Sequence, residues 1–314
     1  MTNPTQESSI GSLLSSSKRS FEEYLEKEVY PDFRKESAPE LADAMEYSLR
    51  AGGKRLRPIL VFASYGRIDS DSLALAASLE FIHTYSLIHD DLPSMDNDDF
   101  RRGKPSLHRQ FSEATAILAG DALQTYAFSW LGRIHSSQEN IHRDLLLLLA
   151  EGSGATGMVS GQMYDLLLER NPSSLTGTKE ELLLTTHRLK TGALIQASFR
   201  LGNRLRSDYK NRISSIDKYG SNLGLLFQIT DDILDVEGTQ EDLGKTPGKD
   251  GKSGKITYPS VYGMQACKEK VRTLVSELKE IGTELDAPSQ VSGIASDFPK
   301  FFSYLPEYIG TRKN

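Results

Sequence analysis

The chain has 314 residues, 38% of them hydrophobic, which is enough to bury the core of one large domain or two modest ones. A formal net charge of −6 gives no support for nucleic-acid binding, because the chain as a whole would repel a phosphate backbone. The single cysteine, Cys267, excludes disulfides and thiolate metal sites within one chain. Any metal ion would therefore be held by oxygen and imidazole ligands, a set that favours hard cations such as Mg²⁺.

Residues 1–18 are rich in serine and contain no long apolar stretch. We predict a flexible N-terminal tail there rather than a secretory signal, with an organelle transit peptide as the alternative. The longest apolar run, Leu145–Ala150, is far shorter than the roughly 20 residues that cross a bilayer. We therefore expect no membrane span and a cytoplasmic protein.

Apolar residues recur at helical spacing from Phe21 to about Asp286, and sustained alternation of period two is absent. This pattern predicts one all-α domain over residues 19–314, with no interdomain linker. The expected breaks fall at glycine, proline and polar clusters: Gly52-Gly53, Pro93, Gly103–Pro105, Asn171-Pro172, Ser207-Asp208 and Gly244–Gly254. Residues 283–300 show no readable period.

Two aspartate clusters, about 140 residues apart, each end an apolar helical pattern. They are Asp90-Asp91 with Asp96, and Asp231-Asp232 with Asp235. Carboxylates gathered in an apolar setting repel one another unless they share a divalent cation. Asp231 and Asp235 lie on one helix face, whereas Pro93 should end the earlier helix and let a loop carry Asp96 back beside Asp90. A solvated acidic helix end would explain one cluster, but the pair favours a metal site.

Basic residues lie next to these carboxylates in the sequence. Lys54, Arg55 and Arg57 follow the first glycine turn, and Arg101, Arg102 and Lys104 follow the first aspartate cluster. Dense cations beside metal-binding carboxylates suggest diphosphate ligands, one bridged by metal ions and a second held by arginine and lysine side chains alone. A solvated helix start is the alternative interpretation of the first basic group.

Three further segments carry weaker signals. His83 and Ser86 share a helix stripe with Asp90 and could line one cavity, although a lone histidine on an apolar helix is commonly a core residue. Four glycines at helical spacing, Gly152, Gly154, Gly157 and Gly161, should let a neighbouring helix approach closely over Met163–Leu168. The basic segment 244–255 does not fit a P-loop, and we predict a mobile lid, with a merely flexible surface loop as the alternative.

Six motifs occur in order: Gly53–Pro58, Ile82–Asp91, Arg101–Gly103, Gly161-Gln162 with Asp165, Lys190–Gly192 and Phe227–Asp235. Together they resemble the trans-isoprenyl diphosphate synthases, and within that family the bacterial farnesyl diphosphate synthases. The resemblance spans roughly residues 40–265. It implies an isoprenoid-synthase-type helical bundle around a central active-site cavity, and a homodimer.

The resemblance also implies a reaction, the Mg²⁺-dependent head-to-tail condensation of isopentenyl diphosphate with dimethylallyl or geranyl diphosphate to give farnesyl diphosphate. Three Mg²⁺ ions would bind the six aspartates, Asp90, Asp91, Asp96, Asp231, Asp232 and Asp235. Side chains that would bind the allylic diphosphate are Arg101, Lys190 and Lys255, with Lys245 also assigned to substrate binding. Those that would bind the metal-free diphosphate are Lys54, Arg57, His83 and Arg102. Thr191 and Gln228, together with Lys190, would act at the reacting carbon.

Product length in this family depends on what blocks the cavity floor upstream of the first acidic motif. Here that residue would be Tyr85, with Ser86 beside it, about 7.5 Å along the helix from Asp90. We therefore expect a C15 product, while a purely structural core aromatic is the alternative. Geranylgeranyl diphosphate synthase is the competing function, and a non-catalytic synthase subunit is a more remote one.

Overall fold

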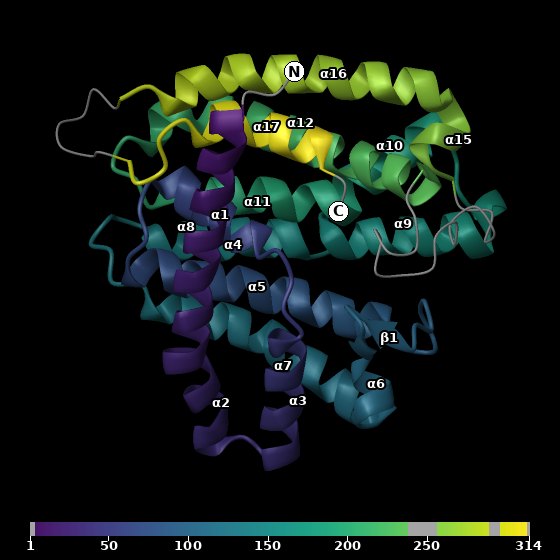
Figure 1. Cartoon of the computed structure of the whole chain (residues 1–314). Coiled ribbons are helices and arrows are strands. Elements are labelled where there is room, and N and C mark those ends of the chain that lie inside the picture. The colour runs from purple at the N-terminus through teal and green to yellow at the C-terminus, as the bar shows by residue number, and fades with distance from the viewer. Residues whose placement is uncertain (1–3, 238–255, 289–295, 313–314) are drawn as a thin grey trace.

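The structure is a computed structural model that describes residues 4–237, 256–288 and 296–312 (Figure 1). Its elements in chain order are α1 (Pro4–Tyr24), η1 (Leu25–Val29), α2 (Tyr30–Glu36), α3 (Pro39–Arg50), α4 (Leu56–Tyr65), α5 (Ser70–Asp90), β1 (Phe100–Arg101), β2 (Lys104–Pro105), α6 (Leu107–Gln110), α7 (Glu113–Trp130), η2 (Leu131–Arg133), α8 (Ile141–Ser153), α9 (Met158–Arg170), η3 (Pro172–Ser174), α10 (Lys179–His187), η4 (Arg188–Gly192), α11 (Ala193–Arg204), α12 (Tyr209–Glu237), α15 (Tyr258–Tyr262), α16 (Met264–Asp286) and α17 (Phe301–Thr311). The all-α prediction is confirmed.

The long helices are arranged around α5 and α11. Helix α5 packs against α4 and α7, α11 packs against α4, α8 and α12, and α16 covers α12 and α17. Figure 1 shows α16 along one side of the bundle and α7 and α3 on the other, with β1 and α15 both at its right-hand end. Within the described ranges, no helix combines the length and apolar character needed to cross a membrane.

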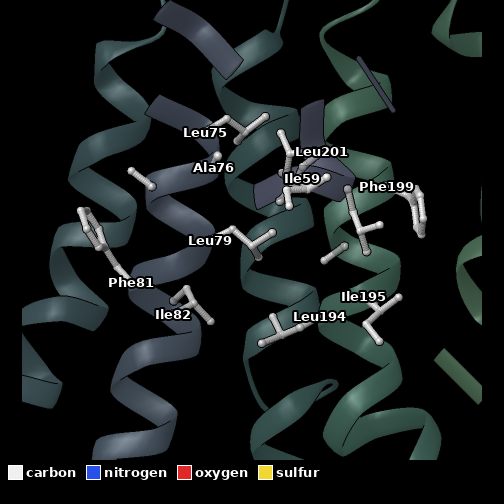
Figure 2. Packing of buried hydrophobic residues seen from close by; sticks show 14 of the residues in the cluster. Ile59, Leu75, Ala76, Leu79, Phe81, Ile82, Leu194, Ile195, Phe199 and Leu201 are labelled. Carbon is white, nitrogen blue, oxygen red and sulfur yellow. The ribbon is translucent and has the colours of Figure 1, made fainter. Parts of the chain in front are cut away.

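The core joins side chains from helices far apart in the sequence. Figure 2 shows Ile59 of α4 near Leu75 and Leu79 of α5 and near Leu201 of α11, with Phe199 of α11 farther out on the same side as Leu201. All five side chains belong to one hydrophobic cluster that extends from α1 to α17. This packing holds α5, α11 and, through α11, α12 in fixed relative positions. The two aspartate clusters lie on α5 and α12 or directly after them.

Helix α5 has clear start and stop signals. The Asp69 side chain accepts a hydrogen bond from Ser72 N at 3.0 Å, and the Ser72 hydroxyl accepts one from Asp69 N at 2.9 Å, which forms a capping box. The helix ends at Asp90, because Pro93 disfavours helical geometry at the preceding residue and cannot donate a backbone hydrogen bond. The first aspartate pair is therefore at the end of a long, buried, rigid element.

The flexible tail expected over residues 1–18 is wrong for residues 4–18, which belong to helix α1. Ile10 and Ser17 are each 2% exposed, and Phe21 is fully buried. With Leu14, these residues recur every three or four positions and form the inner face of the helix, which packs on α4 and α17. The abundance of serine concealed this stripe.

Candidate active site

The loop after α5 returns the third aspartate of the first cluster to the first. The backbone N–H of Asp96 donates to the carbonyl of Asp90 at 2.9 Å, and the N–H of Asn97 donates to Leu92 O at 3.1 Å. This is the return path that Pro93 predicts. The loop therefore brings Asp90 and Asp96 close together although they are not helical neighbours.

Asp90 and Asp91 have different surroundings. The pKa of Asp90 is raised to about 6, mainly by loss of hydration, which the charge of Lys190 opposes and the charge of Asp96 reinforces. Asp91 is 2% exposed and binds Arg101, whose Nε lies 3.1 Å from both carboxylate oxygens and whose Nη2 donates to one of them. Among the residues that the structure describes, Asp90 makes no close ion pair of the kind that neutralises Asp91.

The second cluster lies on the last turns of α12. Asp232 is 5% exposed and accepts hydrogen bonds from Gln228 Nε2 at 2.9 Å and from the backbone N–H of Tyr258 at 2.7 Å. Asp231 is more open and accepts a hydrogen bond from Arg312 Nη2 at 2.5 Å. Asp235 is buried. Asp232 is therefore fixed by donors from α12 and α15, whereas Asp231 contacts the side chain of Arg312.

Lys190 and Thr191 lie on η4, a π-helical turn between α10 and α11. Lys190 Nζ pairs with Asp165 of α9 at 2.5 Å, and Thr191 Oγ1 donates to Gln228 Oε1 at 2.7 Å. Because Gln228 in turn donates to Asp232, a hydrogen-bonded chain runs from η4 to the second aspartate cluster. Short π-helical insertions are common at functional sites because they displace side chains from the regular helical register.

A small cavity lies beside this chain of hydrogen bonds. Its wall includes Asp165, Lys190, Gln228 and Asp232, together with residues of α9 and α10. The charge of Lys190 also lowers the pKa of Asp90, so this lysine lies within electrostatic range of the first cluster while sharing a cavity with the second. Lys190 is therefore the side chain that links the two acidic groups.

The donor set fits magnesium. The aspartates offer oxygen ligands, and a cation beside Asp90 would offset both its lost hydration and its repulsion by Asp96. In the described parts of the chain, no three Asp, Glu, His or Cys side chains already form a close metal-binding group. A bound diphosphate, which supplies its own oxygens, would complete the ligand set.

The predicted basic group forms an anion-attracting cluster. Arg57 Nη1 lies 3.3 Å from His83 Nε2, and loss of hydration lowers the pKa of Arg57 to about 10. Burial, followed by the charges of Arg57 and Arg102, holds the pKa of His83 well below its usual value, so this imidazole is neutral at pH 7. Within the described ranges, Lys54, Arg57 and Arg102 make no ion pair with a carboxylate.

Arg55 belongs to the same sequence motif but has a structural contact. Its Nη1 donates to Glu80 at 2.7 Å and its Nη2 donates to Leu49 O at 2.5 Å, with both ion-pair side chains buried. Glu80 thus neutralises Arg55. The arginine adopts a left-handed backbone (φ 51°) immediately before α4, so the pair fixes the turn that carries Lys54 and Arg57.

A hairpin that the sequence did not predict brings Arg102 to this turn. Strands β1 and β2 are antiparallel, and Arg102 and Gly103 between them both have positive φ, as in a type I′ turn. Arg102 donates to the carbonyl of Gly52. Gly53 has a φ of +124°, a conformation that favours glycine, and a Cβ there would lie 2.7 Å from Arg102 Cζ, so the guanidinium would have to move away.

Tyr85 and Ser86 lie on the last two turns of α5. Tyr85 is 5% exposed, its ring meets that of His89 edge to face at 5.8 Å, and its hydroxyl has no hydrogen-bond partner among the described residues. Ser86 Oγ donates to the carbonyl of His83 at 2.9 Å, within its own helix. Tyr85 is the bulky side chain of the two.

The predicted ligands Lys245 and Lys255, and the predicted lid 244–255, lie outside the described residues.

The sequence interpretation missed Arg312, which lies near the end of the chain. Its guanidinium binds Asp231 and the carbonyl of Phe227, and lies 3.9 Å from the centre of the Phe227 ring. Its charge also lowers the pKa of Lys54, after the larger effect of lost hydration. The basic pair Arg312-Lys313 was a compositional signal, but nothing in its spacing indicated which carboxylate it would reach.

Known proteins share the sequence and the fold of this chain. A family model described as polyprenyl synthetase matches residues 38–291. The chain is 46% identical over 270 residues to the farnesyl diphosphate synthase of Micrococcus luteus (85% of this chain, 89% of that protein). It is 42% identical over 269 residues to the geranylgeranyl diphosphate synthase of Cyanophora paradoxa (82% and 87%). The structure of geranyltransferase from Helicobacter pylori complexed with magnesium and isoprenyl diphosphate superposes with a TM-score of 0.77 and 30% identity, over 99% of this chain and 98% of that one. The chain belongs to the polyprenyl synthetase family.

Proposed function

We propose that this protein condenses isopentenyl diphosphate with dimethylallyl or geranyl diphosphate, head to tail, to give farnesyl diphosphate. The observation that carries the proposal is the basic group Lys54, Arg57 and Arg102, which makes no ion pair with a carboxylate of the described residues and lies within electrostatic range of Asp231 and Asp91. One diphosphate fits the cations directly, and the other fits the carboxylates through metal ions. The relatives named as farnesyl diphosphate synthases support the same reaction.

The six aspartates are the proposed ligands of three Mg²⁺ ions. When bound, the ions supply positive charge that stabilises the diphosphate leaving group of the allylic substrate. The magnesium in the related geranyltransferase supports this assignment. Asp91 and Asp232 additionally orient neighbouring groups, since Asp91 holds Arg101 and Asp232 holds the amide of Gln228. The diphosphate of the allylic substrate also binds Arg101 and Lys190. Lys245 and Lys255, which lie outside the described residues, bind it as well.

The chemistry is an ionisation followed by alkylation. As the carbon–oxygen bond of the allylic diphosphate breaks, its electron pair leaves with the diphosphate and an allylic cation forms. The double bond of isopentenyl diphosphate attacks that cation, and loss of one proton restores a double bond in the product. Thr191 and Gln228, oriented by their mutual hydrogen bond, present oxygen dipoles that stabilise the cation. No side-chain nucleophile is needed.

The second diphosphate is bound without metal. Arg57 and Arg102 provide guanidinium groups, Lys54 provides an ammonium group, and neutral His83 provides a ring nitrogen that can donate a hydrogen bond. Loss of hydration lowers the pKa of both Arg57 and Arg102, so a bound anion would stabilise the charged forms of these groups. The arrangement is suited to hold isopentenyl diphosphate while its double bond faces the cation.

The buried ring of Tyr85 favours a C15 product, because it is bulky and lies upstream of Asp90 on the helix that ends at the metal site. The geranylgeranyl synthase relative keeps a C20 product as the second candidate.

We also propose one cytoplasmic domain that forms a homodimer. Large apolar side chains left exposed on α7 and α8, among them Leu118 and Leu147, support the dimer.

The test is a product assay. The purified protein is incubated with Mg²⁺, labelled isopentenyl diphosphate and geranyl diphosphate, and the chain length of the product is measured. We expect farnesyl diphosphate, and a loss of about 100-fold or more in rate for Asp231→Asn. The matched control is Asp43→Asn, which removes an exposed carboxylate paired with Arg34. A C20 product would favour the second candidate, and no elongation would overturn the proposed function.

A further inference from the structure

Arg170, the last residue of α9, contacts the loop that follows α5. Its Nη1 donates to the carbonyl of Ser94 at 3.1 Å, and its Nη2 donates to the carbonyl of Met95 at 2.6 Å. The planar guanidinium thus binds two consecutive carbonyl groups at once, a geometry that the point charge of a lysine does not reproduce. The second of these carbonyls belongs to the peptide unit that ends at the nitrogen of Asp96.

The two peptide units before Asp96 are therefore bound on both sides. The N–H of Met95 donates to Leu92 O at 2.9 Å. The N–H of Asp96 donates to Asp90 O, also at 2.9 Å. Because the N–H and C=O groups of a trans peptide point in opposite directions, Arg170 binds the edge of each unit that faces away from these acceptors. The end of α5 and Arg170 together fix the orientation of both units.

Hydrogen bonds matter here because the loop has little apolar packing. Pro93, Ser94 and Asp96 are exposed, and among residues 93–97, all of which the structure describes, only Met95 packs against the hydrophobic core. The charge of Asp96 also acts against the ionisation of Asp90, so without a cation the two carboxylates repel each other and favour movement of the loop. The hydrogen bonds from Arg170 oppose that movement.

Helix α9 is a firm support for Arg170, because it is held against η4. A Cβ on Gly161 would lie 2.0 Å from the backbone nitrogen of Lys190, so the two backbones are in close contact. Four residues further along α9, the carboxylate of Asp165 pairs with Lys190 Nζ at 2.5 Å. Arg170 then ends the helix. Helix α9 therefore joins the loop of the first aspartate cluster to the turn that carries Lys190.

We propose that Arg170 is a positioning residue, which holds the loop after α5 so that Asp96 stays beside Asp90 and can share a divalent cation with it. The sharing of a cation rests on the proposed function, whereas the hold on the loop rests on the two hydrogen bonds alone. The charge of Arg170 acts in the opposite sense, because a positive charge near the carboxylates repels a cation. Substitution can therefore separate positioning from charge.

The first experiment measures hydrogen–deuterium exchange in the full-length, metal-free protein by mass spectrometry. In Arg170→Gln, peptides that contain Met95 and Asp96 should exchange about 3- to 10-fold faster than in the wild type, because their peptide units have lost a support on one side. Arg143→Gln, which removes an exposed arginine of α8, is the matched control and should exchange as the wild type does. Equal exchange of these peptides in the wild type and Arg170→Gln would overturn the proposed hold on the loop.

The second experiment measures the Mg²⁺ concentration that half-saturates prenyl transfer. Positioning predicts a rise of about 3- to 10-fold for Arg170→Gln, larger than any fall in the rate at saturating Mg²⁺, whereas loss of the charge alone predicts a lower Mg²⁺ requirement. Arg170→Lys, which keeps the charge but not the planar fork, should also require more Mg²⁺. An unchanged or lower requirement in Arg170→Gln would overturn the positioning role. If the wild type transfers no prenyl group, the proposed function fails, and the exchange experiment still decides whether Arg170 holds the loop.

Discussion

At the scale of single residues, burial separates side chains that look equivalent in the sequence. Arg55 and Arg57 are two positions apart in one basic motif, yet Arg55 is neutralised by Glu80 while Arg57 faces His83. Loss of hydration lowers the pKa of both Arg57 and His83, and for Arg57 the charges of Glu80 and Asp231 offset this effect only in part. A bound anion would stabilise the charged form of Arg57 and raise its pKa again.

Substitution of Tyr85 tests the proposed floor of the cavity. Tyr85→Ala removes the ring that lies upstream of Asp90, so we expect products longer than C15, measured by chromatography of the dephosphorylated alcohols. Tyr85→Phe is the control, because it keeps the ring and removes a hydroxyl that has no hydrogen-bond partner in the described part of the chain. An unchanged C15 product from Tyr85→Ala would show that this residue does not set chain length.

The sequence could predict which residue types would gather but not their individual partners. The paired aspartates, the basic turn and His83 carry chemistry that follows from side-chain type and spacing. The contact of Arg312 with Asp231 joins residues 81 positions apart and depends on the path of α17, which no local pattern describes. Long-range pairing of this kind becomes visible only once the helices are packed.

At the scale of elements, glycines set how closely the helices that carry the site approach one another. A Cβ on Gly161 of α9 would overlap the backbone of Lys190, and one on Gly152 of α8 would lie 2.7 Å from Ala197 Cβ. Gly161 and Gly152 therefore allow close approaches by η4 and α11, as their spacing predicts, but Met163, in the segment where the contact was expected, is 55% exposed. Gly154 and Gly157 instead lie at the break between α8 and α9.

Gly161→Ala should therefore disturb η4. The added methyl group must displace the turn that carries Lys190 and Thr191, because its nearest atoms are backbone. We expect a loss of about 1 to 3 kcal/mol in the free energy of unfolding, measured by urea denaturation, together with lower activity. Gly11→Ala in α1, where a Cβ meets nothing within 4 Å, should be neutral or stabilising by up to about 1 kcal/mol. Equal stability of the two variants would argue against a close approach at Gly161.

Element boundaries were predictable where a strong local signal existed. Pro93 and the Gly52-Gly53 turn end helices as expected. Helix α1 was missed because serine dominated its composition, and the hairpin at Arg102 was missed because each strand has only two residues. Helix α17 has an internal proline, Pro306, which weakened the helical pattern.

At the scale of the whole molecule, packing places two chemically different anion sites next to each other. Helices α5 and α12 bring the aspartates, the turn before α4 brings Arg57, and the β1–β2 hairpin brings Arg102. Lys190 links the two aspartate clusters, and Arg312 links the second cluster to the basic group. If the proposed function is correct, one of the two diphosphates must bind to the chain's own cations, without metal.

Calorimetric titration of isopentenyl diphosphate in the presence of EDTA tests that requirement most directly. We expect saturable binding to the metal-free wild type and a loss of about 10-fold or more in affinity for Arg57→Gln, since one charge-assisted contact to phosphate is removed. Arg143→Gln, which removes an exposed arginine of α8, should bind as the wild type does. Two results would contradict a metal-free diphosphate site. One is no binding in EDTA with full recovery on addition of Mg²⁺, and the other is equal affinity of the wild type and Arg57→Gln.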